Sequence, residues 1–136
     1  MTIIVDTSLW IVAIRDRSGA AALRLRTAIG NEPVVMAPPI RLELPQGCRR
    51  EPEWRAMLAR VDAFETVTMA SSAWDEAAKI YCRLRQDGLT VRSALDCCIA
   101  QLCIDHDSTL LHCDRDFATI ATVAPLKHRH ILLDKA

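Results

Sequence analysis

The sequence lacks an apolar run long enough to cross a membrane. Its longest stretches, such as residues 9–14, fall far short of the ~20 residues that a spanning helix needs, and Asp6 interrupts the apolar beginning of the chain. No signal peptide is recognisable at the start. We therefore expect a cytoplasmic protein with no membrane partner. A length of 136 residues, 51% of them apolar and 25% charged, predicts a single water-soluble domain over residues 1–136.

Net charge is also lacking, because 17 basic residues are balanced by 17 acidic ones. A protein without net charge has no overall field that attracts polyanions, so composition alone does not predict nucleic-acid binding. Lysine is scarce, and 14 of the 17 basic residues are arginine, whose planar guanidinium suits phosphate and carboxylate groups. Any role in nucleic-acid chemistry must therefore rest on a particular site.

The paired C-x-x-C spacing of structural zinc sites is absent, although the chain has six cysteines. Cys97 and Cys98 are adjacent in an apolar stretch, and no secretion signal accompanies them, which argues against a disulfide framework. We predict reduced and mostly buried thiols. The alternative is a zinc site with ligands from Cys98, Cys103, His106, His112 and Cys113.

Segments of strand and helix character alternate along the chain. Strands are predicted at residues 2–5, 33–37, 64–69 and 109–113, with an edge strand at 131–133. Helices are predicted at residues 7–15, 19–29, 53–61, 72–86, 93–105 and 117–122, and from residue 40. The expected helix N-caps include Thr7 or Ser8, Ser72 and Ser93. This alternation favours an α/β fold with three layers, α/β/α, around a mainly parallel central sheet.

Two aspartates come directly after predicted strands. Asp6 ends the first strand, and Asp114 follows the strand at residues 109–113. Ligands of open parallel sheets collect beyond the carboxyl ends of the strands, where two neighbouring carboxylates repel each other unless a proton or a cation lies between them. A bound divalent metal would relieve this repulsion. The alternative is that each aspartate only caps the following helix.

Three further acids are candidates for the same site. Asp96 lies in the first turn of the helix that Ser93 begins, where an acid also has a capping-box explanation. Glu43 interrupts an apolar stretch and is either part of the site or a solvated side chain. Asp116 follows Asp114 by two residues, and it binds the metal or a water, or only favours the start of the next helix.

Four segments carry these acids in a fixed order and spacing. They are Val5-Asp6-Thr7-Ser8-Leu9-Trp10, Glu43 with Gln46-Gly47, Ser93-Ala94-Leu95-Asp96-Cys97, and Leu111-His112-Cys113-Asp114-Arg115-Asp116-Phe117. Together they resemble the PIN-domain signature of VapC-type toxins, and the resemblance runs nearly from end to end. It implies an endoribonuclease that hydrolyses RNA and leaves a 5′-phosphate and a 3′-hydroxyl. It also implies a small VapB-type antitoxin as partner, and a homodimer.

The resemblance assigns roles within the site. The implied catalytic residues are Asp6, Glu43, Asp96 and Asp114. The implied ligands of Mg²⁺, or of Mn²⁺ in its place, are Asp6, Asp96, Asp114 and, as an accessory member, Asp116. Hard cations prefer such an all-oxygen set, and the metal would orient and help to deprotonate a water for in-line attack on a phosphodiester. Ser8, or Thr7, would hydrogen-bond a carboxylate or a water at the metal.

Substrate and partner contacts are less specific in the sequence. The arginines that fall near the predicted crevice are Arg92 and Arg115, our candidates for binding substrate phosphates, and Arg15 and Arg17. Each of them is alternatively a plain surface residue. Apolar residues such as Trp10 and Ile14 would suit a groove for an antitoxin helix, but side chains with this spacing are more often core.

Pro45 departs from the family pattern, because a proline inside the helix that carries Glu43 removes a backbone donor and favours a kink. Our hypothesis is that Glu43 still reaches the site.

Two other functions are alternatives to the nuclease. A phosphorylated receiver domain needs a lysine near its acidic pocket, and none of Lys79, Lys127 and Lys135 follows a central strand. An RNA- or antitoxin-binding module without catalysis is disfavoured because all four acids are retained.

Overall fold

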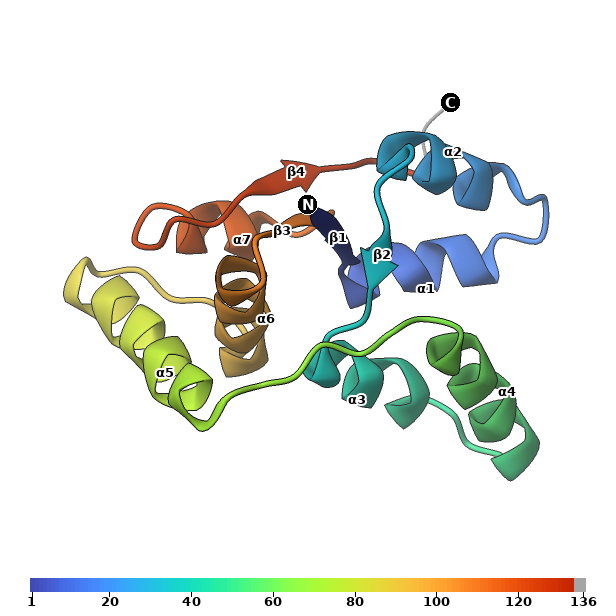
Figure 1. The fold of residues 1–136 in the computed structure, drawn as a ribbon, viewed down its shortest axis with the longest axis horizontal. Helices are drawn as coiled ribbons and strands as arrows, with labels where there is room; N and C mark the ends of the chain where they lie inside the picture. The colour runs from blue at the N-terminus through green and yellow to red at the C-terminus, as the bar shows by residue number, and fades with distance from the viewer. Residues whose placement is uncertain (134–136) are drawn as a thin grey trace.

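A parallel sheet lies at the centre of the computed structural model, which describes residues 1–133 (Figure 1). Its strands are β1 (Thr2–Val5), β2 (Val34–Val35), β3 (Ser108–His112) and β4 (His128–His130), in the order β2-β1-β3-β4. Every neighbouring pair is parallel, and Val5 at the end of β1 pairs with Leu111 near the end of β3. The segments that follow β1 and β3 therefore begin side by side at one edge of the sheet.

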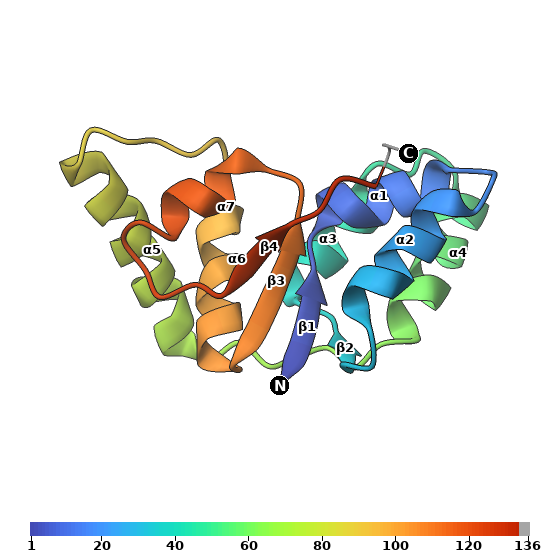
Figure 2. The same cartoon turned by 90° about the horizontal axis from the view of Figure 1, so that it is seen from above.

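Helices cover both faces of this sheet (Figure 2). They are α1 (Thr7–Arg15), α2 (Ala20–Ile29), α3 (Pro38–Gln46), α4 (Glu51–Asp62), α5 (Ser71–Gln86), α6 (Ala94–Asp105) and α7 (Arg115–Ile120). Buried side chains of α1 and α2 pack on one face, whereas those of α3, α5, α6 and α7 pack on the other. The expected three-layer α/β/α arrangement is confirmed.

Alternate residues of the central strands supply the two halves of the core. Ile4 of β1 and Leu110 of β3 belong to the cluster beneath α5 and α6. Ile3 and Leu111 belong to the cluster beneath α1 and α2. Successive side chains of a strand point to opposite faces, so a strand covered on both sides must be apolar at every position. This explains why the central strands are continuous apolar runs in the sequence.

The predicted strand at residues 64–69 is wrong. Only Thr66 forms a bridge to Met36, where the Met36 N–H donates to Glu65 (2.7 Å) and the Val67 N–H donates to Met36 (2.8 Å). The segment has little to pair with, because β2 is only two residues long. Its alternating apolar side chains instead pack against the core from an irregular backbone.

The edge strand lies three residues before its predicted position, at His128–His130 instead of residues 131–133. Pairing of Leu110 with His128 sets its register. Ile131 and Leu133 do pack against the core, but beyond the last paired residue. The apolar pattern of residues 131–133 therefore resembles a strand in the sequence. The residues that do pair, His128–His130, are polar because an edge strand keeps one side near solvent.

Helix boundaries follow local chemistry with small shifts from prediction. Ser93 caps α6 as predicted, since its hydroxyl accepts a hydrogen bond from the Leu95 N–H (3.2 Å). Ser72 is not a cap, because α5 begins at Ser71 after Ala70. α3 and α4 each begin earlier than predicted, with proline in the first turn, where its fixed φ suits a helix and its missing N–H leaves no bond unmade.

All six cysteine thiols are free, and Cys97, Cys98 and Cys103 are buried, as predicted. Burial raises the pKa of the Cys97 thiol to about 11, so this group stays protonated. The alternative zinc site is not assembled: within residues 1–133 no cluster of ligand atoms gathers from these cysteines and histidines, and His106 instead bonds to the Thr68 carbonyl (2.8 Å). None of the helices in the same range is both long and apolar enough to span a bilayer.

The two-faced core makes a simple stability prediction. Leu102 on α6 is fully buried, whereas Leu23 on α2 is 62% exposed. We expect Leu102→Ala to lower the free energy of unfolding by about 2–5 kcal/mol, because it leaves a cavity, and the matched Leu23→Ala to change it by less than about 0.5 kcal/mol. Urea unfolding followed by circular dichroism measures both. Equal effects of the two substitutions would contradict this packing.

Candidate active site

Asp6 and Asp114 lie together at the carboxyl ends of β1 and β3. The backbone N–H of Asp6 donates to the Leu111 carbonyl (2.9 Å), which continues the pairing of the two strands by one residue. Both aspartates are also helix N-caps: Asp6 accepts from the Ser8 N–H (3.2 Å), and Asp114 accepts from the Asp116 N–H (2.9 Å). The capping interpretation is confirmed for both residues, and it is compatible with a role in the site. The prediction that Thr7 or Ser8 caps α1 is wrong.

Asp96 projects from the first turn of α6 toward the same edge and is buried. Burial, followed by repulsion from Asp6, Asp114, Glu43 and Asp116, raises the pKa of Asp96 to about 7. Burial also raises the pKa of Asp6, although hydrogen bonds from Ser8 oppose that rise. The carboxylates thus disfavour one another's charge, which is the condition that a divalent cation relieves.

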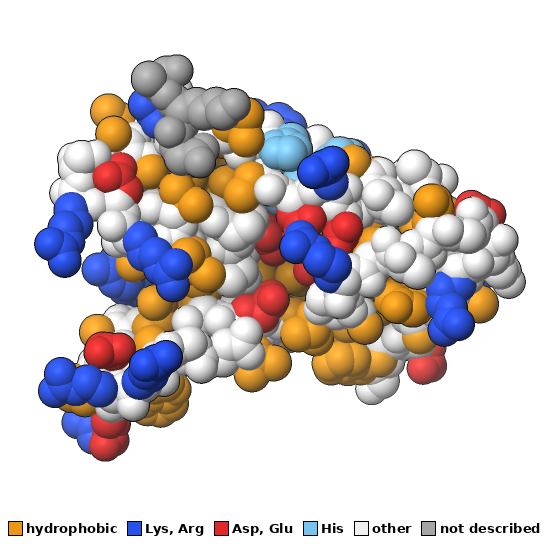
Figure 3. Space-filling view, turned by 180° about the vertical axis from the view of Figure 1, so that it is seen from behind, with side chains coloured by type: hydrophobic (Ala, Val, Ile, Leu, Met, Phe, Trp, Pro, Cys, Tyr) orange, Lys and Arg blue, Asp and Glu red, His pale blue; other side chains and the backbone are white. Residues whose placement is uncertain are grey.

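Three of these acids form a cluster of the size that a metal ion needs. One carboxylate oxygen from each of Asp96, Asp114 and Asp116 lies within 4.8 Å of the others. Asp116, expected as the weaker member, is therefore a member of the cluster. Asp6 is not one of these three residues, but its charge contributes most among the neighbouring charges that raise the pKa of Asp96. Figure 3 shows acidic side chains gathered near the middle of one face, with basic side chains beside and over them. The oxygen-only donor set fits Mg²⁺ or Mn²⁺.

Glu43 stays at the site despite Pro45. Helix α3 continues through Pro45, which lies in its last turn and is buried. The hydroxyl of Thr7 donates to Glu43 Oε1 (3.1 Å), so the carboxylate faces the start of α1. Burial raises the pKa of Glu43, with a smaller contribution from the charge of Asp6. The hypothesis that Glu43 reaches the acidic site despite the proline fits this geometry.

The hydroxyls of Ser8 and Thr7 are both directed at carboxylates. Ser8 Oγ donates to Asp6 Oδ2 (2.6 Å) and accepts from the Cys113 N–H (3.4 Å). Ser8 thus joins the segment after β1 to the segment after β3. Thr7 holds Glu43 in the same way, so each hydroxyl orients one acid of the site.

The candidate arginines occupy different places. Arg92 lies on the cluster: its Nη2 donates to Asp114 Oδ2 (2.8 Å), and its Nε approaches Asp116 Oδ2 (3.4 Å). Arg15 lines a cavity of about 280 Å³ together with Glu43. Arg115 is exposed at the start of α7, and Arg17 is exposed beyond α1; neither has a side-chain ion pair within residues 1–133.

His112 is a residue of the site that sequence reasoning considered only as a zinc ligand. The Asp114 N–H donates to His112 Nδ1 (3.2 Å), which places the proton on Nε2, and Nε2 then donates to His128 Nδ1 (2.9 Å). Burial, with the neighbouring His128 and His130, lowers the pKa of His112 to about 4 and keeps the ring neutral. Its position two residues before Asp114, at the end of a strand, is the signal that was available.

Two mycobacterial proteins are similar over nearly the whole chain. One is a VapC ribonuclease, Mb1587, of Mycobacterium bovis, and the other is Ribonuclease VapC11 of Mycobacterium tuberculosis. Each is 31% identical over 128 residues, which cover 92% of this chain and 96% of the relative.

Solved structures share the fold at lower identity. One is VapBC2 from Rickettsia felis bound to a DNA fragment from the promoter, with a TM-score of 0.74, 18% identity and coverage of 96% of this chain and 99% of that one. Another is VapBC-1 from nontypeable Haemophilus influenzae, with a TM-score of 0.73, 18% identity and coverage of 96% and 98%. These likenesses confirm the arrangement of strands and helices.

A family model matches residues 3–123, a range that runs from β1 past α7 and contains all five acids of the site. With the relatives at 31% identity, this match decides the classification that the motifs indicated. The chain belongs to the PIN-domain family.

Proposed function

We propose that the protein is the toxin of a VapB–VapC type pair, an endoribonuclease that uses Mg²⁺ to hydrolyse RNA phosphodiester bonds. The observation that carries the proposal is the environment of Asp96, which three other elements surround with carboxylates and whose pKa they help to raise to about 7. A purely structural acid is normally given positive or hydrogen-bonding neighbours instead. The mycobacterial relatives named as ribonucleases support the same activity.

The metal would be held by Asp96, Asp114 and Asp116, with Asp6 beside them. When bound, it supplies positive charge to the phosphate and lowers the pKa of an attacking water. Asp6, fixed by Ser8, adds negative charge that favours the cation. In the metal-free protein these carboxylates repel one another, and either a cation or a proton relieves the repulsion. Metal binding should therefore be coupled to loss of the Asp96 proton.

Glu43 would accept a proton from the attacking water. The Thr7 hydroxyl donates to Oε1, and within residues 1–133 no hydrogen bond engages Oε2, which would take this role. Its raised pKa makes the carboxylate a better base than an ordinary glutamate. Arg92 and Arg115 would hold phosphates of the RNA, since guanidinium groups suit phosphate oxygens and both side chains are exposed near the cluster.

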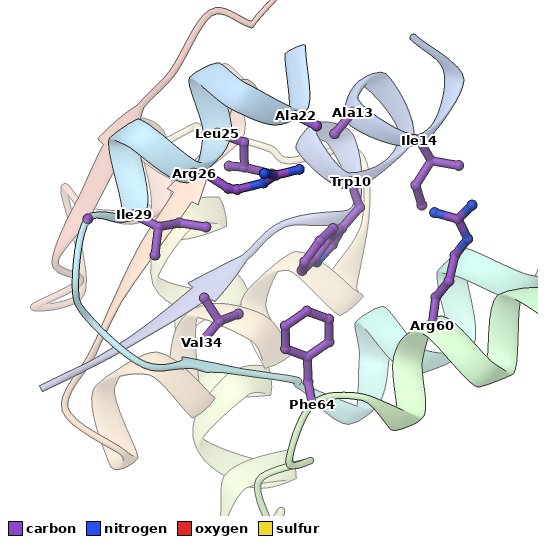
Figure 4. A pocket seen from close by; sticks show the side chains of 11 residues that line it. Trp10, Ala13, Ile14, Ala22, Leu25, Arg26, Ile29, Val34, Arg60 and Phe64 are labelled. Atoms are coloured by element: carbon purple, nitrogen blue, oxygen red, sulfur yellow. The ribbon is translucent and has the colours of Figure 1, made fainter. Parts of the chain in front are cut away.

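The partner would be a VapB-type antitoxin that docks on an apolar groove of about 530 Å³ beside α1 and α2. Trp10 and Phe64 line this groove, with ring centroids 5.2 Å apart. Figure 4 shows Arg26 and Arg60 on either side of Trp10. An apolar groove between cations fits a helical segment with an apolar face and acidic borders. The solved neighbours are described as VapBC complexes, which supports this class of partner. The homodimer stays a prediction.

The nuclease is tested with purified protein, free of antitoxin, and total cellular RNA in Mg²⁺ or Mn²⁺. We expect cuts that EDTA abolishes and that Asp6→Asn or Asp96→Asn reduces by at least about a hundredfold, because the metal's contribution amounts to several kcal/mol. Asp75→Asn removes an exposed acid of α5 and serves as the matched control. Sequencing of the ends maps the sites. Cuts that persist equally in all variants would reject the proposal, whereas metal binding without cuts would favour the non-catalytic module.

Asp96→Asn also makes a stability prediction with a defined sign. The pKa of Asp96 is about 7 in the folded protein, above the ordinary value of 3.8. Between pH 3.8 and 7 the metal-free folded protein therefore binds one more proton than the unfolded protein, and it loses stability as the pH rises through this range. At pH 8 in EDTA we expect the asparagine variant to be more stable by on the order of 2–4 kcal/mol, and this gain should vanish near pH 4.

Thermal melts of Asp96→Asn and Asp75→Asn across this pH range measure the effect. Added Mn²⁺ should stabilise the wild type and the Asp75 variant, but not the Asp96 variant. A destabilised Asp96→Asn protein at pH 8 would show that the carboxylate is not under repulsion.

The groove is tested by reversing its two flanking charges. Arg26→Glu with Arg60→Glu should weaken binding of a co-expressed VapB-type antitoxin at least about tenfold, because each new acid repels the acidic borders of the helix. Arg85→Glu with Arg83→Glu, on α5, is the control with the same change in charge. Biolayer interferometry gives the affinities. Without antitoxin, the groove variant should keep normal ribonuclease activity. If its affinity for the antitoxin is unchanged, the antitoxin binds elsewhere.

A further inference from the structure

Arg92 occupies the acidic cluster as a cation supplied by the chain itself. Its guanidinium binds Asp114 Oδ2 at 2.8 Å and approaches Asp116 Oδ2 at 3.4 Å. Asp114 and Asp116 are two of the three residues whose oxygens are spaced for a metal. The pairing raises the pKa of Arg92 further, so its charge is permanent. A monovalent cation and a divalent one therefore compete for the same carboxylates.

The attachment of Arg92 is rigid at the backbone and loose at the side chain. Its own N–H donates to Asp116 Oδ2 (2.9 Å), and its neighbours are the buried Val91 and Ser93, the N-cap of α6. The side chain is nevertheless 80% exposed, whereas the carboxylates of Asp114 and Asp116 are 19% and 17% exposed. An ion pair this exposed is held by little free energy, so the guanidinium is free to leave while its backbone anchor stays in place.

We propose that Arg92 is an exchange residue: it neutralises Asp114 and Asp116 in the metal-free protein, is released when the metal binds, and then takes up a phosphate of the RNA backbone. This inference rests on the proposed metal site and adds an order of binding to it. Asp114 and Asp116 exchange the Arg92 guanidinium for the metal, and the released guanidinium then binds an RNA phosphate next to the metal site. Metal binding thereby creates the phosphate contact, which couples the two ligands.

Two consequences distinguish this role from that of an ordinary substrate arginine. Removing the charge of Arg92 must strengthen metal binding, because the competing cation is gone. It must also weaken RNA binding in the presence of the metal. An arginine that only held the carboxylates in position would weaken metal binding when removed, and one that only held the RNA would leave metal affinity unchanged.

The test measures Mn²⁺ affinity of the full chain without RNA, by calorimetry or by the rise in melting temperature with Mn²⁺ concentration. Arg92→Gln keeps the backbone N–H bond to Asp116 and removes the charge. We expect it to bind Mn²⁺ roughly tenfold more tightly, the size of effect for a single positive charge a few ångströms from a divalent ion in screened, water-like surroundings. Arg92→Lys keeps the charge and should stay near the wild type. Arg55→Gln, which breaks an exposed pair with Glu51 on α4, is the matched control.

A second measurement follows the other half of the exchange. This measurement is fluorescence anisotropy with a short single-stranded RNA, with and without Ca²⁺ as the divalent ion. Ca²⁺ should increase the RNA affinity of the wild type more than that of Arg92→Gln. Equal or weaker Mn²⁺ binding by Arg92→Gln, relative to the wild type and Arg55→Gln, would overturn the exchange while leaving the metal site intact. If neither the wild type nor any variant binds Mn²⁺, the proposed metal site and the exchange are both wrong.

Discussion

Repulsion among carboxylates is the constraint on which the site depends. Parallel pairing of β1 with β3 brings Asp6 and Asp114 to one edge of the sheet, and the first turn of α6 adds Asp96 to this group. Two neighbouring groups oppose this repulsion in part: Ser8 donates to Asp6, and Arg92 pairs with Asp114. Burial, followed by the repulsion that remains, raises the pKa of Asp96 to about 7. Under the proposed function, the negative charge that remains on the cluster would favour a divalent cation.

The same acids also stabilise the fold locally. Asp6 and Asp114 each begin a helix, and each uses one carboxylate oxygen to satisfy an N–H that the helix leaves free. Capping fixes each carboxylate in position through a hydrogen bond from the backbone N–H two residues further along the chain. Because the cap already restricts the side chain, little further conformational freedom is lost when a ligand binds. A helix cap can therefore also be part of a preorganised site.

Site and groove lie at successive positions along α1. Asp6 and Thr7 at its beginning belong to the acidic edge, whereas Trp10 and Ile14, further along, line the apolar groove. One helix therefore connects the proposed RNA chemistry with the proposed partner surface. Ile14 and Arg15 also line the cavity that contains Glu43, so a ligand in the groove and an RNA at the cluster would approach each other near the end of this helix.

The sequence by itself determined the layers of the fold and the members of the acidic cluster. The layers depend on apolar runs that mark buried strands, and Asp114 was indicated by an acid where such a run stops. Asp96 and Asp116 were indicated by the family resemblance of their segments. The tertiary structure decided what depends on residues far apart in the chain. It reduced the expected strand at residues 64–69 to one bridge because β2 is short, and it kept Glu43 at the site because Thr7 holds it across the α1–α3 contact. It also placed Arg92 on Asp114 and His112 against His128, since the loop before α6 and the edge strand meet the end of β3 only in the folded chain.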